Sequence, residues 1–225
     1  MSIYVIADLH LSFSQDKPMD IFGKNWESHA EKIKQDWLAK VNDDDMVVLP
    51  GDFSWAMHLE DTYLDFKYLN ELPGKKVLLK GNHDYWWTTV TSMKKFLEEK
   101  KFNNIEFLYN NAIEYENKVF VGSRGWALQD TENSKKMINR ECQRLEISIK
   151  DAINNYDNTK EIIAFMHYPP LVKQQLLENN HLEFYKVLKK YDIKRCYYGH
   201  LHGNSIYDAV EGKIQGIELK LVSAD

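Results

Sequence analysis

Five short apolar runs in this 225-residue sequence are each followed by side chains that can bind a metal ion. The runs are IYVIA, MVVLP, KVLLK, EIIAFM and RCYY. The side chains that follow them belong to Asp8, His10, Asp52, Asn82, His167, His200 and His202. Asp8 and His10 are spaced i, i+2, as are His200 and His202. In an extended segment both side chains of such a pair lie on one face and can reach a single ion.

All seven side chains are oxygen or imidazole donors. Carboxylate, amide and imidazole ligands without a thiolate suit Mn, Fe, Zn or a related divalent ion, rather than calcium or a cysteine-based structural zinc. Seven ligands are too many for one ion, but with a bridging carboxylate they divide into two sites about 3.5–4 Å apart, the spacing of two-metal hydrolytic centres. We expect Asp52 to bridge, because it stands alone between the paired ligands. The predicted cofactors are therefore two divalent transition-metal ions.

Each motif has an ordinary explanation when it stands alone. An Asp-x-His can arise by chance, a Gly-Asp often marks a turn, and a buried histidine is more often hydrogen-bonded than metal-bound. Their coincidence favours the metal interpretation, since five of the eight histidines in the chain lie in these groups when His83, next to Asn82, is included.

The elements that must position these groups follow an α/β pattern. Apolar, β-branched runs predict strands at 3–7, 46–50, 76–80, 118–122, 162–166 and 195–198, and helical spacing predicts helices at 26–41, 59–71, 87–100, 131–154 and 174–190. Residues 103–122 and 203–222 predict short strands joined by turns, with hairpins marked by Glu116-Asn117 and Glu211-Gly212. The candidate ligands thus follow the carboxyl ends of strands, where α/β sheets bind ligands. A glycine precedes Asp52, Asn82 and His200, which lets the chain leave each strand in a tight turn.

Composition limits the class of protein and the partners that we expect. Hydrophobic residues make up 44% of the chain and charged residues 28%, a balance typical of a folded globular protein, and the length fits one domain spanning residues 1–225. The net charge of −5 disfavours nucleic acid as a partner, although one local basic groove could still serve. No apolar segment reaches membrane length and no signal-peptide pattern is present, so we expect a cytoplasmic protein without a membrane partner. The oligomeric state stays open.

The series DxH, GD, GNH(D/E), a lone H and GHxH, in this order from Asp8 to His202, resembles that of the calcineurin-like metallophosphoesterases. The resemblance implies a four-layer α/β fold in which two mixed β-sheets pack as a sandwich and are flanked by helices. It also implies the metal ligands. One ion would be held by Asp8, His10, Asp52 and His202, and the other by Asp52, Asn82, His167 and His200.

The same resemblance implies catalytic roles for His83 and Asp84. His83 would lie beside the scissile phosphate and protonate the leaving oxygen, and Asp84 would orient it. A neighbouring carboxylate would also keep the imidazole protonated near neutral pH. Two ions that share a bridging hydroxide as nucleophile would complete the site. The predicted activity is hydrolysis of a phosphodiester or phosphomonoester bond in a small phosphorylated substrate.

Two differences from the motifs of known subfamilies narrow the choice of subfamily. Protein Ser/Thr phosphatases carry an arginine after the Gly-Asp motif, whereas this chain has Phe53. Purple acid phosphatases place a tyrosine ligand where this chain has Trp55, and an indole cannot coordinate a metal. The chain therefore resembles the small prokaryotic members. Arg124, in a loop after another strand, is a candidate substrate-binding residue in place of the missing arginine, or an ordinary loop arginine.

Two other functions stay open at this stage. The first is a nuclease or nucleotide phosphodiesterase, in which tryptophans near the motif turns would stack on a base rather than pack helices onto the sheet. These tryptophans are Trp55, Trp86, Trp87 and Trp126. The second is a non-catalytic metal-binding scaffold, and the presence of His83 beside Asn82 argues against it.

Overall fold

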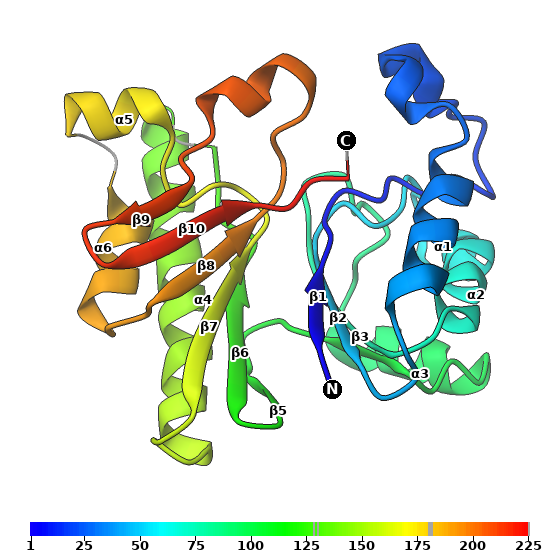
Figure 1. The fold of residues 1–225 in the computed structure, drawn as a ribbon, viewed down its shortest axis with the longest axis horizontal. Helices are drawn as coiled ribbons and strands as arrows, with labels where there is room; N and C mark the ends of the chain where they lie inside the picture. The colour runs from blue at the N-terminus through cyan, green and yellow to red at the C-terminus, as the bar shows by residue number, and fades with distance from the viewer. Residues whose placement is uncertain (128, 130, 180–181, 225) are drawn as a thin grey trace.

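The computed structural model describes residues 1–127, 129, 131–179 and 182–224. It consists of two β-sheets that face each other, with helices on both outer faces (Figure 1). The four-stranded sheet has the order β1-β2-β3-β4, formed by Ile3–Val5, Met46–Pro50, Lys75–Leu79 and Ile105–Phe107. The six-stranded sheet has the order β5-β6-β7-β8-β10-β9, formed in sequence order by Ile113–Tyr115, Lys118–Ser123, Glu161–Met166, Arg195–Tyr198, Gly212–Ile214 and Ile217–Leu221.

Helices α1 to α3 cover the outer face of the four-stranded sheet, and α4 and α6 cover that of the six-stranded sheet. The α-helices, α1 to α6, are His29–Lys40, Tyr63–Glu71, Val90–Glu99, Glu132–Asn155, Lys173–Glu178 and Glu183–Lys190. The 3₁₀ turns, η1 to η4, are Met19–Phe22, Lys24–Trp26, Leu59–Thr62 and Gly203–Asp208. This arrangement confirms the predicted α/β sandwich flanked by helices.

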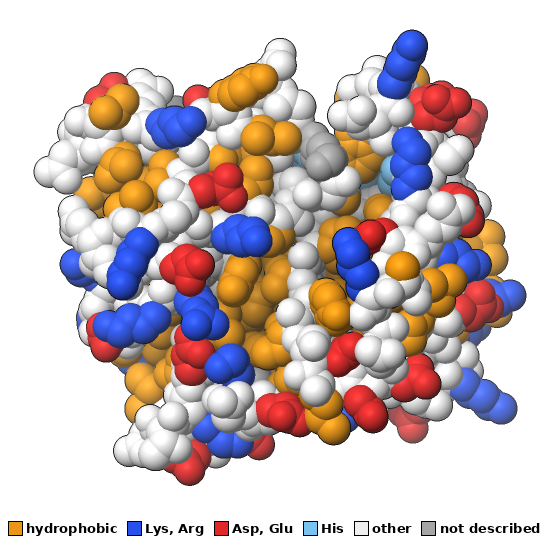
Figure 2. All heavy atoms as spheres, viewed as in Figure 1, with side chains coloured by type: hydrophobic (Ala, Val, Ile, Leu, Met, Phe, Trp, Pro, Cys, Tyr) orange, Lys and Arg blue, Asp and Glu red, His pale blue; other side chains and the backbone are white. Residues whose placement is uncertain are grey.

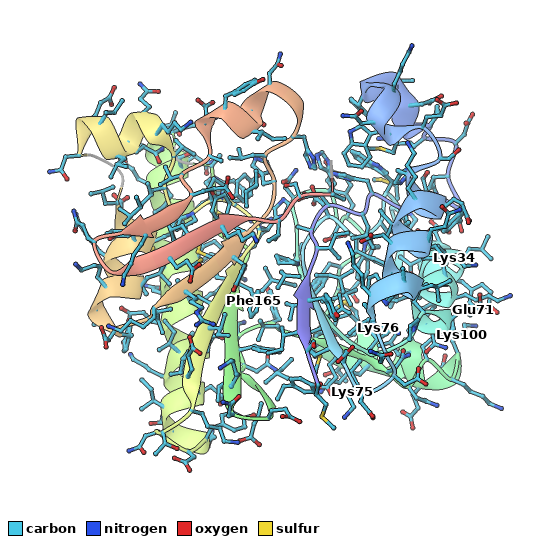
Figure 3. All side chains as sticks on the ribbon, in the orientation of Figure 1. Lys34, Glu71, Lys75, Lys76, Lys100 and Phe165 are labelled. Carbon is cyan, nitrogen blue, oxygen red and sulfur yellow. The ribbon has the colours of Figure 1, made fainter. Side chains whose placement is uncertain are left out.

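Strand β2 shows why the sheets pack in this way. All five of its residues are buried, because alternate side chains serve two different cores. Val47 and Leu49 pack against the helices, whereas Met46 and Val48 face the other sheet. Phe165, labelled in Figure 3, belongs to the same inter-sheet core. A strand buried on both faces reads as a continuous apolar run, which is how β2 stands out in the sequence.

The two sheets differ in strand direction. Every pairing in the four-stranded sheet is parallel. The expectation that this sheet is mixed is therefore wrong. Helices connect its consecutive strands, and a helical crossover lets the next strand run in the same direction as the previous one. The six-stranded sheet is mixed, because its outer strands β5 and β9 run antiparallel to their neighbours. The predicted hairpin at Glu116 is confirmed, and this residue has a left-handed backbone with φ of 57°.

The predicted helix at 174–190 is wrong as a single element. The chain forms α5 and α6 instead, and α5 ends at Glu178, because the φ of 53° at the following Asn179 is left-handed and cannot continue a helix. Residues 180–181 lie outside the described part of the chain. Residues 203–222 begin with the 3₁₀ turn η4. The hairpin expected at Glu211-Gly212 turns instead at Gln215 and Gly216, because Gly212 is already the first residue of β9 and pairs with β10.

The C-terminal segment links the two sheets at the carboxyl ends of their strands. Beyond β10, the amide of Val222 donates to the carbonyl of Tyr198 at 2.9 Å, and the carbonyl of Val222 accepts from the amide of Ala7 at 2.8 Å. Figure 1 shows this segment crossing toward the end of β1. Within the described ranges, no helix combines the length and apolarity needed to span a bilayer.

Candidate metal centre

Four of the seven predicted ligands have left-handed backbone conformations. The φ angles are 64° at Asp8, 47° at His10, 52° at Asp52 and 74° at His200. Such conformations cost a non-glycine residue on the order of 1 kcal/mol or more and persist only where the surroundings hold them. Here the turns after β1 and β2 hold each other, because the amides of Asp8 and His10 donate to the carbonyls of Gly51 and Asp52 at 3.0 and 2.9 Å. The left-handed residues aim these side chains across the ends of the strands.

The glycines before the ligands act in two ways. Gly51 has a φ of 93°, as a tight turn requires. Gly81 and Gly199 have no such φ, but a Cβ atom on Gly81 would collide with the carboxylate of Asp52, and one on Gly199 with the carboxylate of Asp8. The prediction of a turn glycine is therefore right for Gly51 only. The other two make room for a carboxylate.

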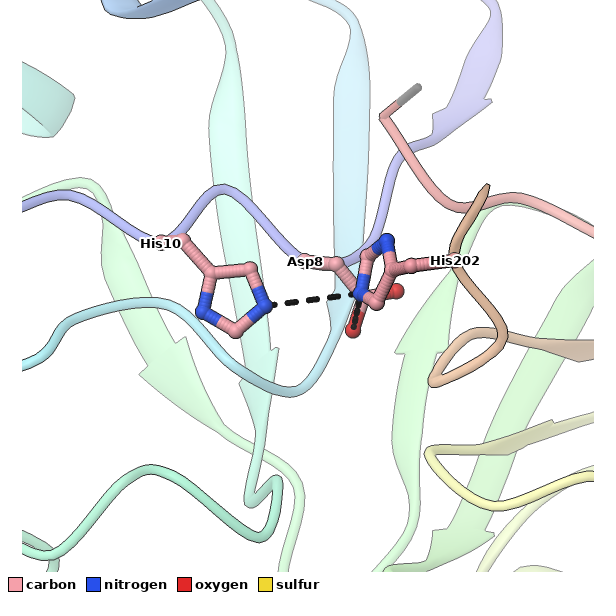
Figure 4. A group of neighbouring side chains, drawn as sticks. All are labelled: Asp8, His10 and His202. Carbon is pink, nitrogen blue, oxygen red and sulfur yellow. Dashed lines mark hydrogen bonds and ion pairs between the residues drawn. The ribbon is translucent and has the colours of Figure 1, made fainter. Parts of the chain in front are cut away.

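One group of donors consists of Asp8, His10 and His202 (Figure 4). Their ligand atoms all lie within 4.8 Å of one another. Nε2 of His202 lies 3.2 Å from Oδ1 of Asp8 and 3.4 Å from Nε2 of His10. The other oxygen of Asp8 accepts hydrogen bonds at 2.9 Å from the amide of His200 and from the hydroxyl of Ser223. These bonds leave Oδ1 turned toward the two imidazoles.

A second group consists of Asp8, Asp52 and His167. Nδ1 of His167 lies 3.0 Å from the carbonyl oxygen of Pro50, which can only accept, so Nδ1 carries the proton and Nε2 presents a lone pair. Nε2 in turn lies 2.6 Å from Oδ1 of Asn82 and 3.4 Å from Oδ2 of Asp52. Three acceptor atoms thus converge on one point, an arrangement that a bound cation satisfies.

The two groups share their carboxylates. Oδ2 of Asp52 lies 3.7 Å from Nε2 of His10 and 3.4 Å from Nε2 of His167, so one oxygen reaches both groups. Oδ1 of Asp8 lies 3.2 Å from Nε2 of His202, but on the His167 side it lies 3.8 Å from the protonated Nδ1 rather than from the lone-pair nitrogen. Asp52 thus lies between the two groups, and that it bridges two ions stays a prediction.

His200 stands apart from these compact groups. Its ring packs against His167, with ring centres 5.1 Å apart, and against Tyr168, with ring centres 4.0 Å apart. It therefore borders the second group through His167.

The charges of the site depend on its burial. Burial lowers the pKa of His10 and of His200 to about 3, so both rings are neutral near pH 7. Burial and the charge of Asp8 raise the pKa of Asp52 to about 8. Burial also acts to raise the pKa of Asp8, but His202 and the other imidazoles outweigh it and lower that pKa to about 2. Two buried carboxylates that lie close together beside several imidazoles are donors that fit divalent metal ions.

His83 borders the first group without belonging to it. Its ring centre lies 5.7 Å from that of His10 and 4.4 Å from that of Trp55, and its amide donates to Oδ1 of Asp52 at 2.8 Å. Burial and the neighbouring His167 lower the pKa of His83 to about 4. The expectation that Asp84 keeps this ring protonated is therefore wrong for the protein without metal or substrate.

Asp84 also does not orient the ring. Its buried carboxylate accepts five hydrogen bonds, four from backbone amides and one from an indole, at 2.7–3.2 Å. The donors are Asp52, Phe53, Ser54, Gly81 and Trp86. Since these donors come from the turns after β2 and β3, Asp84 fixes the backbone that carries Asp52 and Asn82.

Arg124 lies to one side of the metal groups. Its guanidinium is 4.6 Å from the ring centre of Trp126, and its carbonyl accepts from the amide of Tyr168 at 2.9 Å. Tyr168 packs on His200, so Arg124 reaches the site through an intervening ring. Substrate binding by Arg124 stays a prediction.

The four tryptophans divide between core and site. Trp86 and Trp87 belong to the core beneath α2 and α3, and Trp126 packs at the edge of the core beneath α4. Only Trp55 contacts a predicted ligand, because its ring stacks on His10 with centres 4.9 Å apart.

Ser223, Trp26 and Tyr168 lie at the site but were not among the sequence candidates. Ser223 follows β10 at its carboxyl end, so the strand-end pattern that identified the ligands also points to it. Trp26 lies in the loop between β1 and α1, and its ring centre is 5.4 Å from that of His202 and 5.9 Å from that of His10. No local sequence signal marks Trp26.

The comparison with known families agrees with this geometry. The model of the calcineurin-like phosphoesterases matches residues 1–204, a range that contains every predicted ligand. The chain belongs to the calcineurin-like phosphoesterase family. Phosphoesterases of this family depend on divalent metals, so this member is in general terms a metal-dependent hydrolase of phosphate esters.

Solved structures share the fold of this phosphoesterase. A protein of unknown function from Aquifex aeolicus is 18% identical with a TM-score of 0.53, over 99% of this chain and 90% of that one. The phosphopantetheinyl hydrolase of Mycobacterium tuberculosis is 14% identical with a TM-score of 0.52, over 98% of this chain and 88% of that one. No curated protein matches the sequence. At these identities the likeness concerns the fold alone.

Proposed function

We propose that this phosphoesterase hydrolyses a phosphomonoester or phosphodiester bond of a small phosphorylated substrate at a two-metal centre, with His83 as the general acid. The observation that carries the proposal is the sharing of two buried carboxylates, Asp8 and Asp52, by two groups of imidazoles. A pair of divalent ions is the partner that such a donor set would satisfy.

The proposed ligands are those of the motif series. One ion would be held by Asp8, His10, Asp52 and His202, and the other by Asp52, Asn82, His167 and His200. When bound, the ions supply Lewis acidity for the phosphoryl oxygens and activate water for attack on phosphorus.

The protein itself would position the substrate and move one proton. His83 lies on the same turn as Asn82, its amide is held by Asp52, and its ring faces the first group. A phosphate dianion bound beside this imidazole raises the pKa of His83 by direct charge attraction, so the ring becomes protonated when the substrate arrives. His83 would then donate its proton to the oxygen of the departing alcohol.

The test combines metal content with turnover. Protein loaded with Mn²⁺ is expected to hold about two ions per chain and to hydrolyse p-nitrophenyl phosphate or bis-p-nitrophenyl phosphate. The ratio of the two rates separates monoesterase from diesterase activity, and a single-stranded oligonucleotide included as a third substrate tests the nuclease alternative. Bound metal without any turnover would favour the scaffold alternative instead.

Matched variants connect the result to the site. Asp52→Asn is expected to lose metal and activity together. Asp65→Asn changes another fully buried carboxylate, one that belongs to neither metal group, and is expected to retain metal. If both variants keep two ions per chain, Asp52 is not a ligand and the proposed centre is wrong.

A further inference from the structure

A cavity of about 280 Å³ opens beside the first metal group. Its polar wall consists of His10, His83 and His202. Two of these are proposed metal ligands and the third is the proposed general acid. A group that occupies the cavity therefore lies next to the residue that protonates the leaving oxygen.

A second part of the cavity wall is apolar. It consists of Met19, Phe22, Trp26 and Trp55. Met19, Trp26 and Trp55 form a small cluster of their own, separate from the three larger cores that hold the layers together. Phe22 is 64% exposed although it lines the cavity. This cluster therefore forms part of the wall around the site and does not pack helices onto the sheets.

Contacts between the histidines and the apolar side chains of the cavity wall fix their relative positions. Trp55 stacks on His10 at an interplanar angle of 22°, and its indole N–H donates to the sulfur of Met19 at 3.2 Å. Trp26 presents its ring to His202 at 64°, with the ring centres 5.4 Å apart. The aromatic surfaces are thus held in place before any ligand arrives, which reduces the entropy lost on binding.

The apolar wall comes mainly from the loop between β1 and α1. Figure 1 shows this loop, with its turns η1 and η2, standing beyond the carboxyl ends of the strands on the side of α1, while η4 stands on the opposite side. In Figure 2 the outline of the molecule is indented between these two segments. The ammonium of Lys17, from the same loop, lies 4.0 Å from the ring centre of Trp55 and places a positive charge near the cavity.

We propose that this cavity binds an aromatic ring carried by the alcohol of the substrate, so that the preferred substrates are phosphate esters of planar aromatic alcohols. The inference rests on the proposed function, because it places the leaving group on the His83 side of the phosphorus. An apolar cavity of about 150 Å³ holds a benzene ring, so about 280 Å³ accommodates one or two rings with their linking atoms. An apolar wall also disfavours polyol alcohols, whose hydroxyls would lose their hydrogen bonds to water.

Binding of two phosphonates tests the cavity directly. Benzylphosphonate keeps the shape of phenyl phosphate but cannot be hydrolysed as an ester, and ethylphosphonate lacks the ring. Calorimetric titration of the Mn²⁺-loaded protein is expected to give a Kd for benzylphosphonate about tenfold lower than that for ethylphosphonate.

Variants of η1 provide a matched pair. Phe22→Ala removes an exposed ring that lines the cavity and is expected to reduce the preference for benzylphosphonate about fivefold. Ile21→Ala removes a neighbouring side chain that is 73% exposed and does not line the cavity, so it is expected to leave the preference unchanged. Trp26→Ala is expected to reduce the preference further. If that variant does not fold, Phe22→Ala decides.

The outcomes separate the two proposals. Turnover of p-nitrophenyl phosphate with equal Kd values for the two phosphonates would overturn the cavity inference alone. The same holds if Phe22→Ala and Ile21→Ala change the preference equally. Metal-loaded protein that binds benzylphosphonate preferentially but hydrolyses no phosphate ester would overturn the proposed function and leave the cavity as an aromatic binding site.

Discussion

The hydroxyl of Ser223 donates a hydrogen bond to Oδ2 of Asp8 at 2.9 Å, although 215 positions separate the two residues in the chain. The amide of His200 binds the same oxygen, so the other oxygen of Asp8 faces the imidazoles of the first metal group. Ser223 lies beyond residues 1–204, the range that the family model matches. The C-terminal segment thus helps to orient a predicted ligand from outside the motif series.

Ser223→Ala is expected to weaken Mn²⁺ binding about tenfold, because hydrogen-bond partners of metal ligands hold those ligands in position. Ser223→Thr keeps a hydroxyl and is expected to restore most of the affinity. Calorimetric titration with Mn²⁺ measures both variants. An alanine variant that binds Mn²⁺ as tightly as the original protein would show that the contact does not orient Asp8.

His83→Ala is expected to retain both metals and to lower kcat by about 10²-fold, because the departing alcohol loses its proton donor. His58→Ala serves as the control, since His58 is exposed and lies outside both metal groups. Rates with p-nitrophenyl phosphate and with phenyl phosphate are compared for each variant. The decrease in kcat is expected to be larger for phenyl phosphate, because its leaving oxygen is more basic and departs slowly unless it is protonated. Equal rates for the variant and the original protein would remove the assigned role.

Asp84→Asn is expected to destabilise the protein by about 3 kcal/mol. The buried carboxylate accepts five hydrogen bonds, and an amide in its place would set its own N–H groups against several of those donors. Chemical denaturation of the metal-free protein measures the change. Asp36→Asn, an exposed substitution on α1, is the control and is expected to change the stability by less than about 0.5 kcal/mol. A similar small change for Asp84→Asn would mean that its donors find other partners.

The pH dependence of metal binding follows from Asp52. Its pKa of about 8 in the metal-free protein is raised, so the carboxyl holds a proton at pH 7, and a metal must displace that proton to bind. Affinity is therefore expected to rise about tenfold from pH 6 to 7 and about fivefold from pH 7 to 8, and to level off above. His10 and His200 do not add to this slope, because their pKa values are about 3 and both rings are already neutral.

Titrations with Mn²⁺ at pH 6, 7 and 8 measure this slope. Asp52→Asn removes the titrating group and is expected to flatten it as well as to weaken binding. A flat profile in the original protein would show that Asp52 is already ionised before the metal binds.

The types of the candidate ligands, and the strand ends that carry them, could be predicted from the sequence. Both follow from local rules, since an apolar run of strand length predicts a buried strand and parallel strands present their carboxyl ends together. Strands β2, β7 and β8 were therefore predicted to within about a residue. The left-handed backbones of Asp8 and Asp52 were not predicted, because they depend on hydrogen bonds between two turns.

The other residues that surround these candidate ligands depend on how distant segments pack, and could not be predicted from local patterns. Ser223 meets Asp8 because β10 inserts between β8 and β9, an order that no local pattern encodes. Asp84 binds the turn after β2 rather than His83, because parallel pairing of β2 with β3 brings the two turns together. Trp26 reaches the site through a loop of 3₁₀ turns, whose path depends on packing against Trp55 and Met19 rather than on its own residue preferences.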